Sequence, residues 1–168
     1  SWRWDSSVVP TAGGDPRPLL ENANSLQWLP QRRVLFSEFR HGTDLAIVMA
    51  AEDRTNERDV YVPPPGGMAH FSDLSPDGHR VLIGEMSSGA NALEGWETRF
   101  GCRVIDLQAP GESHPVGTPA VPCMMFARWS RDGRWIYFSS GRDAQWHVWR
   151  QPAGGGSPEQ VTHGTGLA

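Results

Sequence analysis

A segment of about 45 residues occurs three times in this chain of 168 residues, and this internal repeat limits the possible folds more than any other feature. In register, Trp28, Leu74 and Trp129 occupy the same position, at intervals of 46 and 55 residues. Repeats of this length each form one small supersecondary unit, so the chain must stack similar units side by side. The three copies read SLQWLPQRRVLFSEFRHGTDLAIVMA, FSDLSPDGHRVLIGEMSS and FARWSRDGRWIYFSSGRDAQWHVWRQP.

Turn-forming residues are spread along the whole chain rather than gathered in one tract. Gly (19) and Pro (14) separate short apolar runs, which is the pattern of an all-β fold with many turns. The nearest approach to a helical pattern is TDLAIVMAAEDRTNERD, which begins at Thr43. Its apolar block, Leu45 to Met49, fits a buried strand equally well, and the family resemblance described below favours the strand.

Two copies of the repeat carry the same polar turn between two apolar runs. Ser-Pro-Asp-Gly ends at Gly78, and Ser-Arg-Asp-Gly ends at Gly133. Pro presets φ at the first turn position, Asp bonds its own backbone, and Gly takes a positive φ. We therefore interpret Asp77 and Asp132 as hairpin-turn residues rather than catalytic or metal-binding ones. The first copy reads LPQRRVLF, lacks Asp-Gly, and predicts a looser turn.

A repeat of about 45 residues made of four short strands is the signature of a β-propeller blade. We predict an all-β propeller fragment of about three and a half four-stranded antiparallel blades, arranged as an open, unclosed ring. Its predicted parts are residues 1–20 (the end of one blade), 25–68, 71–118 and 123–162 (one blade each), and 163–168 (a tail). The blade at 71–118 contains an inserted loop, 87–101.

At these residues the chain resembles the TolB-like, WD-repeat-like family of β-propellers. An aromatic strand, the Ser-x-Asp-Gly turn and an apolar strand ending in Phe-Ser-Ser carry the resemblance, here ARWSRDGRWIYFSS from Ala127. HVWRQPAGGGSPEQVT follows from His147, and the order of segments is most similar to propellers attached to bacterial receptor-like serine/threonine protein kinases. The resemblance implies a signalling host protein of that kind. No Gly-rich loop, His-Arg-Asp or Asp-Phe-Gly landmark is present, so it implies no kinase activity for this chain.

Charge and hydropathy argue against two classes of partner. The 15 Lys and Arg residues against 19 Asp and Glu residues give a net charge of −4, and the basic residues form no stripe. We therefore expect no nucleic-acid partner. No apolar run approaches the length of a membrane span, and no signal-peptide pattern is present. We therefore expect no membrane insertion by this segment.

The titratable and nucleophilic residues form no recognisable catalytic or metal-binding pattern. The six His residues show no i, i+4 pair, and the sequence has neither Cys-x-x-Cys nor Gly-x-Ser-x-Gly. We therefore expect no catalytic residue, metal ion or cofactor in this chain. Trp28 and Trp129 recur in register, so we interpret them as core residues of the innermost strands.

Contact residues are expected on loops whose sequence the repeat does not dictate. Trp96 lies in the insertion SSGANALEGWETRFG, and an aromatic residue on such a loop is a candidate contact, with loop filler as the alternative. His41 and Arg142 lie on the equivalent loops of the neighbouring blades. The predicted contacts to a protein or small-molecule partner are His41, Leu93, Glu94, Trp96, Arg99 and Arg142.

Cys102 and Cys123 are the only two cysteines. Cys102 opens the third strand of its blade and Cys123 the first strand of the next, which puts both on one face at the junction of two blades. A bridge requires Cα atoms within roughly 7 Å. Two interpretations stay open. A disulfide implies an oxidising, extracytoplasmic compartment, whereas a pair of small buried thiols fits a cytoplasmic protein.

The leading functional hypothesis is a non-catalytic propeller segment of a larger signalling protein, which senses a ligand or acts as a protein-interaction scaffold. Its partners are then other blades or domains of the parent chain and an unidentified protein or small molecule. Two alternatives remain: the substrate-gating propeller of a prolyl-oligopeptidase-type hydrolase, and a periplasmic Tol-type scaffold. The fold by itself does not separate these hypotheses.

Overall fold

The computed structural model describes residues 3–41, 44–86, 100–109, 111–124, 126–142 and 145–164. These residues form fifteen strands and no helix, which confirms the prediction of an all-β chain. The strands are β1 (Ser6–Val8), β2 (Arg17–Leu20), β3 (Asn24–Leu29), β4 (Arg33–Phe39), β5 (Leu45–Ala51), β6 (Arg58–Tyr61), β7 (Met68–Leu74), β8 (Arg80–Met86), β9 (Phe100–Asp106), β10 (Ser113–Thr118), β11 (Val121–Pro122), β12 (Ala127–Trp129), β13 (Trp135–Arg142), β14 (Gln145–Pro152) and β15 (Glu159–Gln160).

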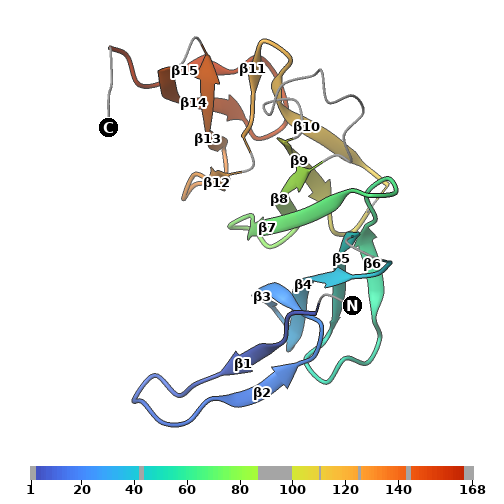
Figure 1. The fold of residues 1–168 in the computed structure, drawn as a ribbon. Helices are drawn as coiled ribbons and strands as arrows, with labels where there is room; N and C mark the ends of the chain where they lie inside the picture. Colours follow the sequence, from blue (N-terminus) through green and yellow to red (C-terminus); the bar gives the residue numbers. More distant parts are fainter. Residues whose placement is uncertain are drawn as a thin grey trace.

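Twelve of these strands form three four-stranded antiparallel blades (Figure 1). The first blade contains β3–β6, the second β7–β10 and the third β12–β15, each with its strands in sequence order. The short β11 pairs with β10, and β1 and β2 form a separate hairpin. A single parallel bridge, Leu45 to Met68, joins the first blade to the second. The blades follow one another along an open arc with the first strands, β3, β7 and β12, on one side of it.

The second strands of the first and second blades, β4 and β8, are buried on both faces because each has a neighbour on both sides, which is another blade or, on one side of β4, the β1–β2 hairpin. In β8, Val81 packs against residues of the first blade and Leu82 against residues of the third. In β4, the equivalent residue Val34 packs on the side of the β1–β2 hairpin, and Leu35 packs against residues of the second blade. All four side chains are at most 1% exposed, as alternating strand residues require when both faces are covered. The ambiguous block that begins at Leu45 is also a strand of this kind, β5.

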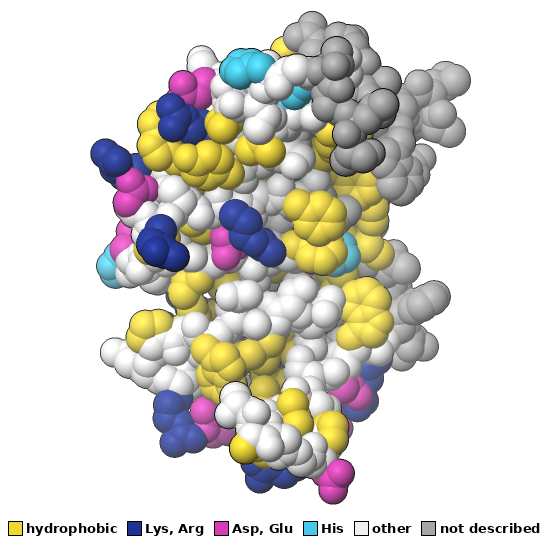
Figure 2. Space-filling view, turned by 90° about the vertical axis from the view of Figure 1, so that its left-hand side faces the viewer, with side chains coloured by type: hydrophobic (Ala, Val, Ile, Leu, Met, Phe, Trp, Pro, Cys, Tyr) yellow, Lys and Arg dark blue, Asp and Glu magenta, His cyan; other side chains and the backbone are white. Residues whose placement is uncertain are grey.

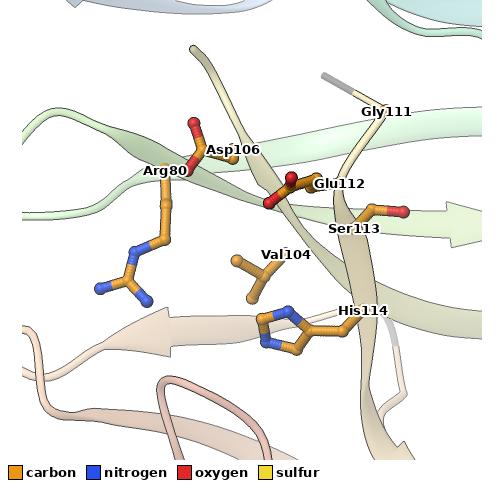
Figure 3. Close-up of a pocket in the computed structure, with 7 residues that line it drawn as sticks. All are labelled: Arg80, Val104, Asp106, Gly111, Glu112, Ser113 and His114. Atoms are coloured by element: carbon orange, nitrogen blue, oxygen red, sulfur yellow. The ribbon is translucent and has the colours of Figure 1, made fainter. Parts of the chain in front are cut away.

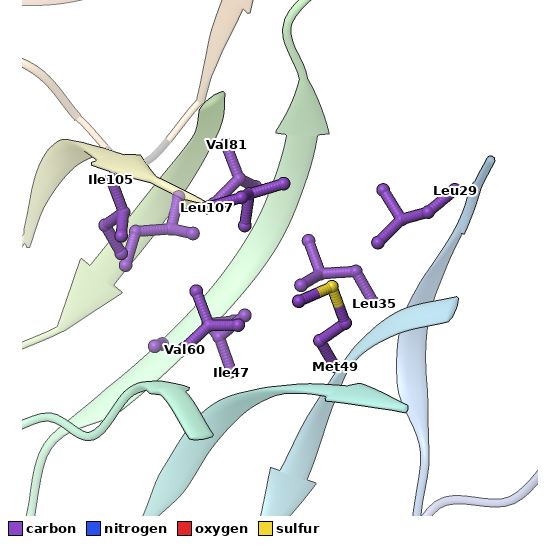
Figure 4. Close-up of a cluster of buried hydrophobic side chains, with 10 residues drawn as sticks. Leu29, Leu35, Ile47, Met49, Val60, Val81, Ile105 and Leu107 are labelled. Atoms are coloured by element: carbon purple, nitrogen blue, oxygen red, sulfur yellow. The ribbon is translucent and has the colours of Figure 1, made fainter. Parts of the chain in front are cut away.

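The hydrophobic core is divided among the junctions between blades. One cluster of buried side chains, which contains Val104 and Ile136, joins the second blade to the third. Another cluster, which contains Leu20 and Phe36, joins the β1–β2 hairpin to the first blade. Each junction therefore depends on residues from both of its sides. Figure 4 shows the junction of the first and second blades, whose buried side chains include Leu29, Leu35, Ile47, Met49, Val60, Val81, Ile105 and Leu107.

The Ser-x-Asp-Gly segments form one and the same hairpin turn. Before β8, the Ser75 hydroxyl donates to Asp77 Oδ1 (2.5 Å) and accepts from the Arg80 backbone N–H (2.9 Å). Asp77 Oδ1 also accepts from the His79 backbone N–H (3.0 Å). The turn before β13 repeats these three bonds at 2.6, 2.9 and 3.1 Å. Hydrogen bonds from the turn serine are the main cause that lowers the pKa of Asp77 and of its counterpart Asp132.

The turn of the first copy is tighter than the two others, not looser as its sequence predicted. Five residues separate the paired Trp28 and Val34, whereas six separate Leu74 and Val81 at the same positions of the second copy. Gln31 and Arg32 have φ angles of 62° and 56°. The loss of Asp-Gly thus comes with one residue fewer in the turn, and two non-glycine residues adopt the left-handed conformation that closes it.

Replacing Gly133 by valine should lower the free energy of unfolding by about 1–2 kcal/mol or more, because its φ of 69° is left-handed. Gly78, at 73° in the equivalent turn, should respond alike. Urea unfolding of each variant measures the change.

Gly154 provides the matched control for these two substitutions. It has no left-handed φ, and an added Cβ would meet no atom within 4 Å. Gly164 does not serve as a control despite its place near the end of the described residues, because its φ is 112°. Equal, small losses of stability at Gly133, Gly78 and Gly154 would contradict the turn assignment.

Trp28 is not a core residue, contrary to the interpretation drawn from its place in the repeat. Its side chain is 53% exposed, whereas Leu74 and Trp129 are partly buried against neighbouring clusters. Trp129 donates from its backbone N–H to Asp73 Oδ2 and from its indole Nε1 to Asp73 O, both at 3.0 Å. Asp73 belongs to the first strand of the preceding blade. In the described residues no such strand precedes the first blade, so Trp28 has nothing to cover it.

Candidate functional site

Two of the predicted contact residues lie at one end of the blades, where the second and third strands are joined: His41 follows β4, and Arg142 ends β13. The last residue pairs of the three hairpins at this end are Phe39 with Leu45, Met86 with Phe100, and Arg142 with Gln145.

The contact role of these residues stays a prediction. Leu93, Glu94, Trp96 and Arg99 lie outside the described residues. Arg142 is the last residue of β13, and its side chain is likewise outside the described part.

His41 is exposed and borders a small hollow of about 240 Å³. Arg40 in this hollow is ion-paired with Asp59 and, at 3.1 Å, with Glu38. Asp44 accepts a hydrogen bond from the Gly66 backbone N–H (2.8 Å). The charges around the hollow are thus largely paired with one another. The lining residues are Arg40, His41, Asp44, Leu45, Ala46, Asp59, Val62 and Pro63.

The opposite end of the second blade carries a larger hollow of about 460 Å³, which the sequence did not predict (Figure 3). In this view the carboxylates of Asp106 and Glu112 lie on the other side of Val104 from the His114 imidazole. Opposite charges that line one hollow suit a small polar ligand rather than an apolar one. The lining residues are Arg80 from β8, Val104 and Asp106 from β9, Gly111 and Glu112 from the connecting loop, and Ser113 and His114 from β10.

Two side chains of this hollow are held at the junction with the third blade. Arg80 Nη1 donates to Ala153 O (3.1 Å), and its guanidinium carbon lies 4.9 Å from the Trp129 ring centre. Burial is the main cause that lowers the pKa of His114, and the charges of Arg80 and Arg103 also lower it, whereas a hydrogen bond with the Ala153 backbone acts in the opposite direction. The Nε2 atom of His114 is buried and has no hydrogen-bond partner among the described residues.

Cys102 and Cys123 form a disulfide at the junction of the second and third blades. Cys102 lies in β9, Cys123 follows β11, and their Cα atoms are 5.6 Å apart. Both are at most 2% exposed and belong to one cluster with Leu82 and Ile136. The alternative of two free thiols does not describe this structure. Disulfides persist mainly in oxidising compartments, so the bridge favours a place outside the cytoplasm.

No three His, Cys, Asp or Glu side chains in the described ranges lie close enough together to hold a metal ion. The same part of the chain contains no helix of the length and apolar character that a membrane span requires.

No protein-family model matches the chain, and no curated protein matches it. Solved structures do. The β-propeller domain of the Trilobed protease from Pyrococcus furiosus, described as having an open velcro topology, matches with a TM-score of 0.51 and 14% identity, over 83% of this chain and 43% of that one. The chain folds as part of a β-propeller.

Two other propeller matches are closer in shape. TolB from Acinetobacter baumannii gives a TM-score of 0.68 at 19% identity, over 95% of this chain and 37% of that one. Acylaminoacyl peptidase from Pyrococcus horikoshii gives 0.63 at 14% identity, over 97% and 28%. Identities this low show the fold alone. The TolB-like resemblance is thus confirmed as a propeller fold, and the chain spans less than half the length of each of these three proteins.

Proposed function

We propose that this chain is a non-catalytic part of a β-propeller in a larger signalling protein, where it presents strand-connecting loops to a ligand or protein partner. The observation that carries the proposal is the division of the core among blade junctions, which leaves the strand ends as the places for specific chemistry. Rigid blades with variable loops are a common platform for recognition. His41 and Arg142 lie at such loops at one end, and the predicted insertion, 87–101, occupies the equivalent position in the sequence repeat.

The host of this propeller is, in our proposal, a receptor-like serine/threonine protein kinase. The order of the sequence segments supports this host. The disulfide between Cys102 and Cys123 supports a place for the propeller outside the cytoplasm, where a receptor meets its ligands. The other blades or domains of that parent protein are its first partners.

Two other functions have specific support. The similarity to acylaminoacyl peptidase favours a propeller that controls access of substrate to a separate hydrolase domain. The similarity to TolB favours a Tol-type scaffold. The gene that encodes the chain distinguishes these three functions, according to whether it also encodes a kinase domain, a hydrolase domain or neither.

The purified 168-residue chain should show no kinase, esterase or peptidase turnover above the blank. The reason is that neither its motifs nor the hollows described above combine a nucleophile, a base and a group that orients the base. Standard assays with ATP and a protein substrate, with p-nitrophenyl esters and with chromogenic peptides measure this. A robust turnover that one point mutation abolishes would contradict the non-catalytic function.

A further inference from the structure

Strand β1 has an open edge that the equivalent strands of the other blades do not have. β1 pairs only with β2 among the described residues. The third strands of the blades, β5, β9 and β14, are each paired on both edges. The β1–β2 hairpin leads into β3 as β5–β6 leads into β7. It is therefore the third and fourth strands of a blade whose first two strands are missing.

Backbone contacts support this equivalence. The Ala23 N–H donates to Trp4 O (2.7 Å), which ties the residues just before β1 to the start of the first blade. The start of β5 is tied to the residues before β7 in a similar way, by a bond between Leu45 and Gly67 (3.2 Å). Both contacts join the entrance of a third strand to the first strand of the following blade.

Ser7 offers its backbone groups at the open edge. Ser7 pairs with Pro18 of β2, and proline has no backbone N–H. This pair is therefore the non-hydrogen-bonded type, in which N–H and C=O point away from the partner strand. Ser7 is exposed, so its N–H and C=O are available to another strand.

The Trp28 side chain is also exposed on the side where the two missing strands would lie. Its counterparts are covered by the first two strands of the preceding blade. Leu74 packs against a cluster that includes Leu29 and Leu35 of the first blade. Trp129 is bonded to Asp73 of β7 and lies beneath Arg80 of β8. The same two strands would therefore pair with the open edge of β1 and cover the exposed Trp28 side chain.

We propose that β1 and Trp28 form the docking site of a two-stranded β-hairpin supplied by propeller sequence outside these 168 residues. Its second strand pairs antiparallel with β1, as β4 pairs with β5, and its first strand lies over Trp28. By analogy with β7–β8 and β12–β13, the hairpin carries a Ser-x-Asp-Gly turn and an apolar second strand. This inference rests on the proposed function in one respect, that the chain is part of a larger propeller.

A second copy of the chain is not the occupant. Its own first and second strands, β3 with β4, β7 with β8 and β12 with β13, are already paired within their blades. Donating one of these hairpins would break the blade that holds it. The matched solved structures extend well beyond the part that this chain covers, which supports further propeller sequence as the source.

Photo-crosslinking at Ser7 tests the proposal in the protein expressed with its natural flanking sequence. A Ser7→benzoylphenylalanine variant is irradiated, digested and analysed by mass spectrometry. We expect the cross-linked peptide to come from outside residues 1–168 and to contain an apolar strand next to a Ser-x-Asp-Gly turn. A peptide from within residues 1–168, from a second copy or from another protein overturns the proposal, and so does the absence of a crosslink.

Matched tryptophan variants give an independent test. Trp28→Ala should leave the Tm of the 168-residue chain nearly unchanged, but should lower the Tm of the longer protein by about 6 °C or more. Trp129→Ala should lower the Tm in both contexts. An equal response to Trp28→Ala in the two contexts overturns the proposal. Enzymatic turnover by the chain would refute the proposed function and leave this docking site intact, so the two failures are distinguishable.

Discussion

Replacing Phe36 by alanine lowers the free energy of unfolding by about 3–5 kcal/mol, the largest effect we expect from a single substitution. Phe36 lies in β4, is fully buried and packs with Val34 and Val48 at the junction that the β1–β2 hairpin covers. The Arg54 guanidinium carbon lies 5.2 Å from its ring centre. The change removes a large apolar side chain and leaves a cavity that neighbouring strands cannot fill. Urea unfolding monitored by tryptophan fluorescence measures it.

Phe126 is the matched control, because the same Phe→Ala change takes place there at a side chain that is 57% exposed. The centre of its ring lies 5.0 Å from that of the Phe71 ring. We expect Phe126→Ala to lower the free energy of unfolding by well under half as much as Phe36→Ala does. Similar losses at Phe36 and Phe126 would show that the junctions do not carry the stability of this fold.

Removing the disulfide should lower the free energy of unfolding by about 3 kcal/mol in the chain-entropy model, because the two cysteines are 21 residues apart. The double variant Cys102→Ser, Cys123→Ser tests this under non-reducing conditions. The bond closes the connection between the second and third blades, so its loss should loosen that junction first. Hydrogen exchange of β9 and β12 measures the local effect.

Reducing agent supplies the control for this prediction. It should bring the wild-type chain to the stability of the double serine variant and leave the variant unchanged. Thiol titration of the non-reduced protein in denaturant should find no free thiol. Two titratable thiols per chain would remove both the bridge and the support that it gives to a place outside the cytoplasm.

The repeat predicted the architecture because a turn with its own hydrogen bonds is encoded locally. Ser75 and Asp77 make the same contacts as Ser130 and Asp132, whatever blade surrounds them. Burial is not encoded in that way. Trp28 stands in register with Trp129, but its burial depends on strands of the preceding blade, and a single repeat carries no information about its neighbours.

The candidate site was predicted only in part. The loops around His41 and Arg142 were placed at one end of the blades because strand order alone fixes that end. The hollow beside Arg80 and His114 was missed, since those residues are distant in the sequence and share no motif. The sequence of β10, SHPVGT, carries no clear alternation of apolar and polar residues that would have marked His114 as half-buried.

The order in which strands pair has a consequence for the synthesis of the protein. Nearly every strand pair joins strands that are consecutive in the sequence, so contacts form between residues that leave the ribosome close together in time. Chains with such local contacts fold quickly, and N-terminal parts fold first. We expect the first blade to be complete while the third is still being made, and its exposed side to act as the template on which the second blade assembles. Each blade in this propeller thereby acts as the folding surface for the next one.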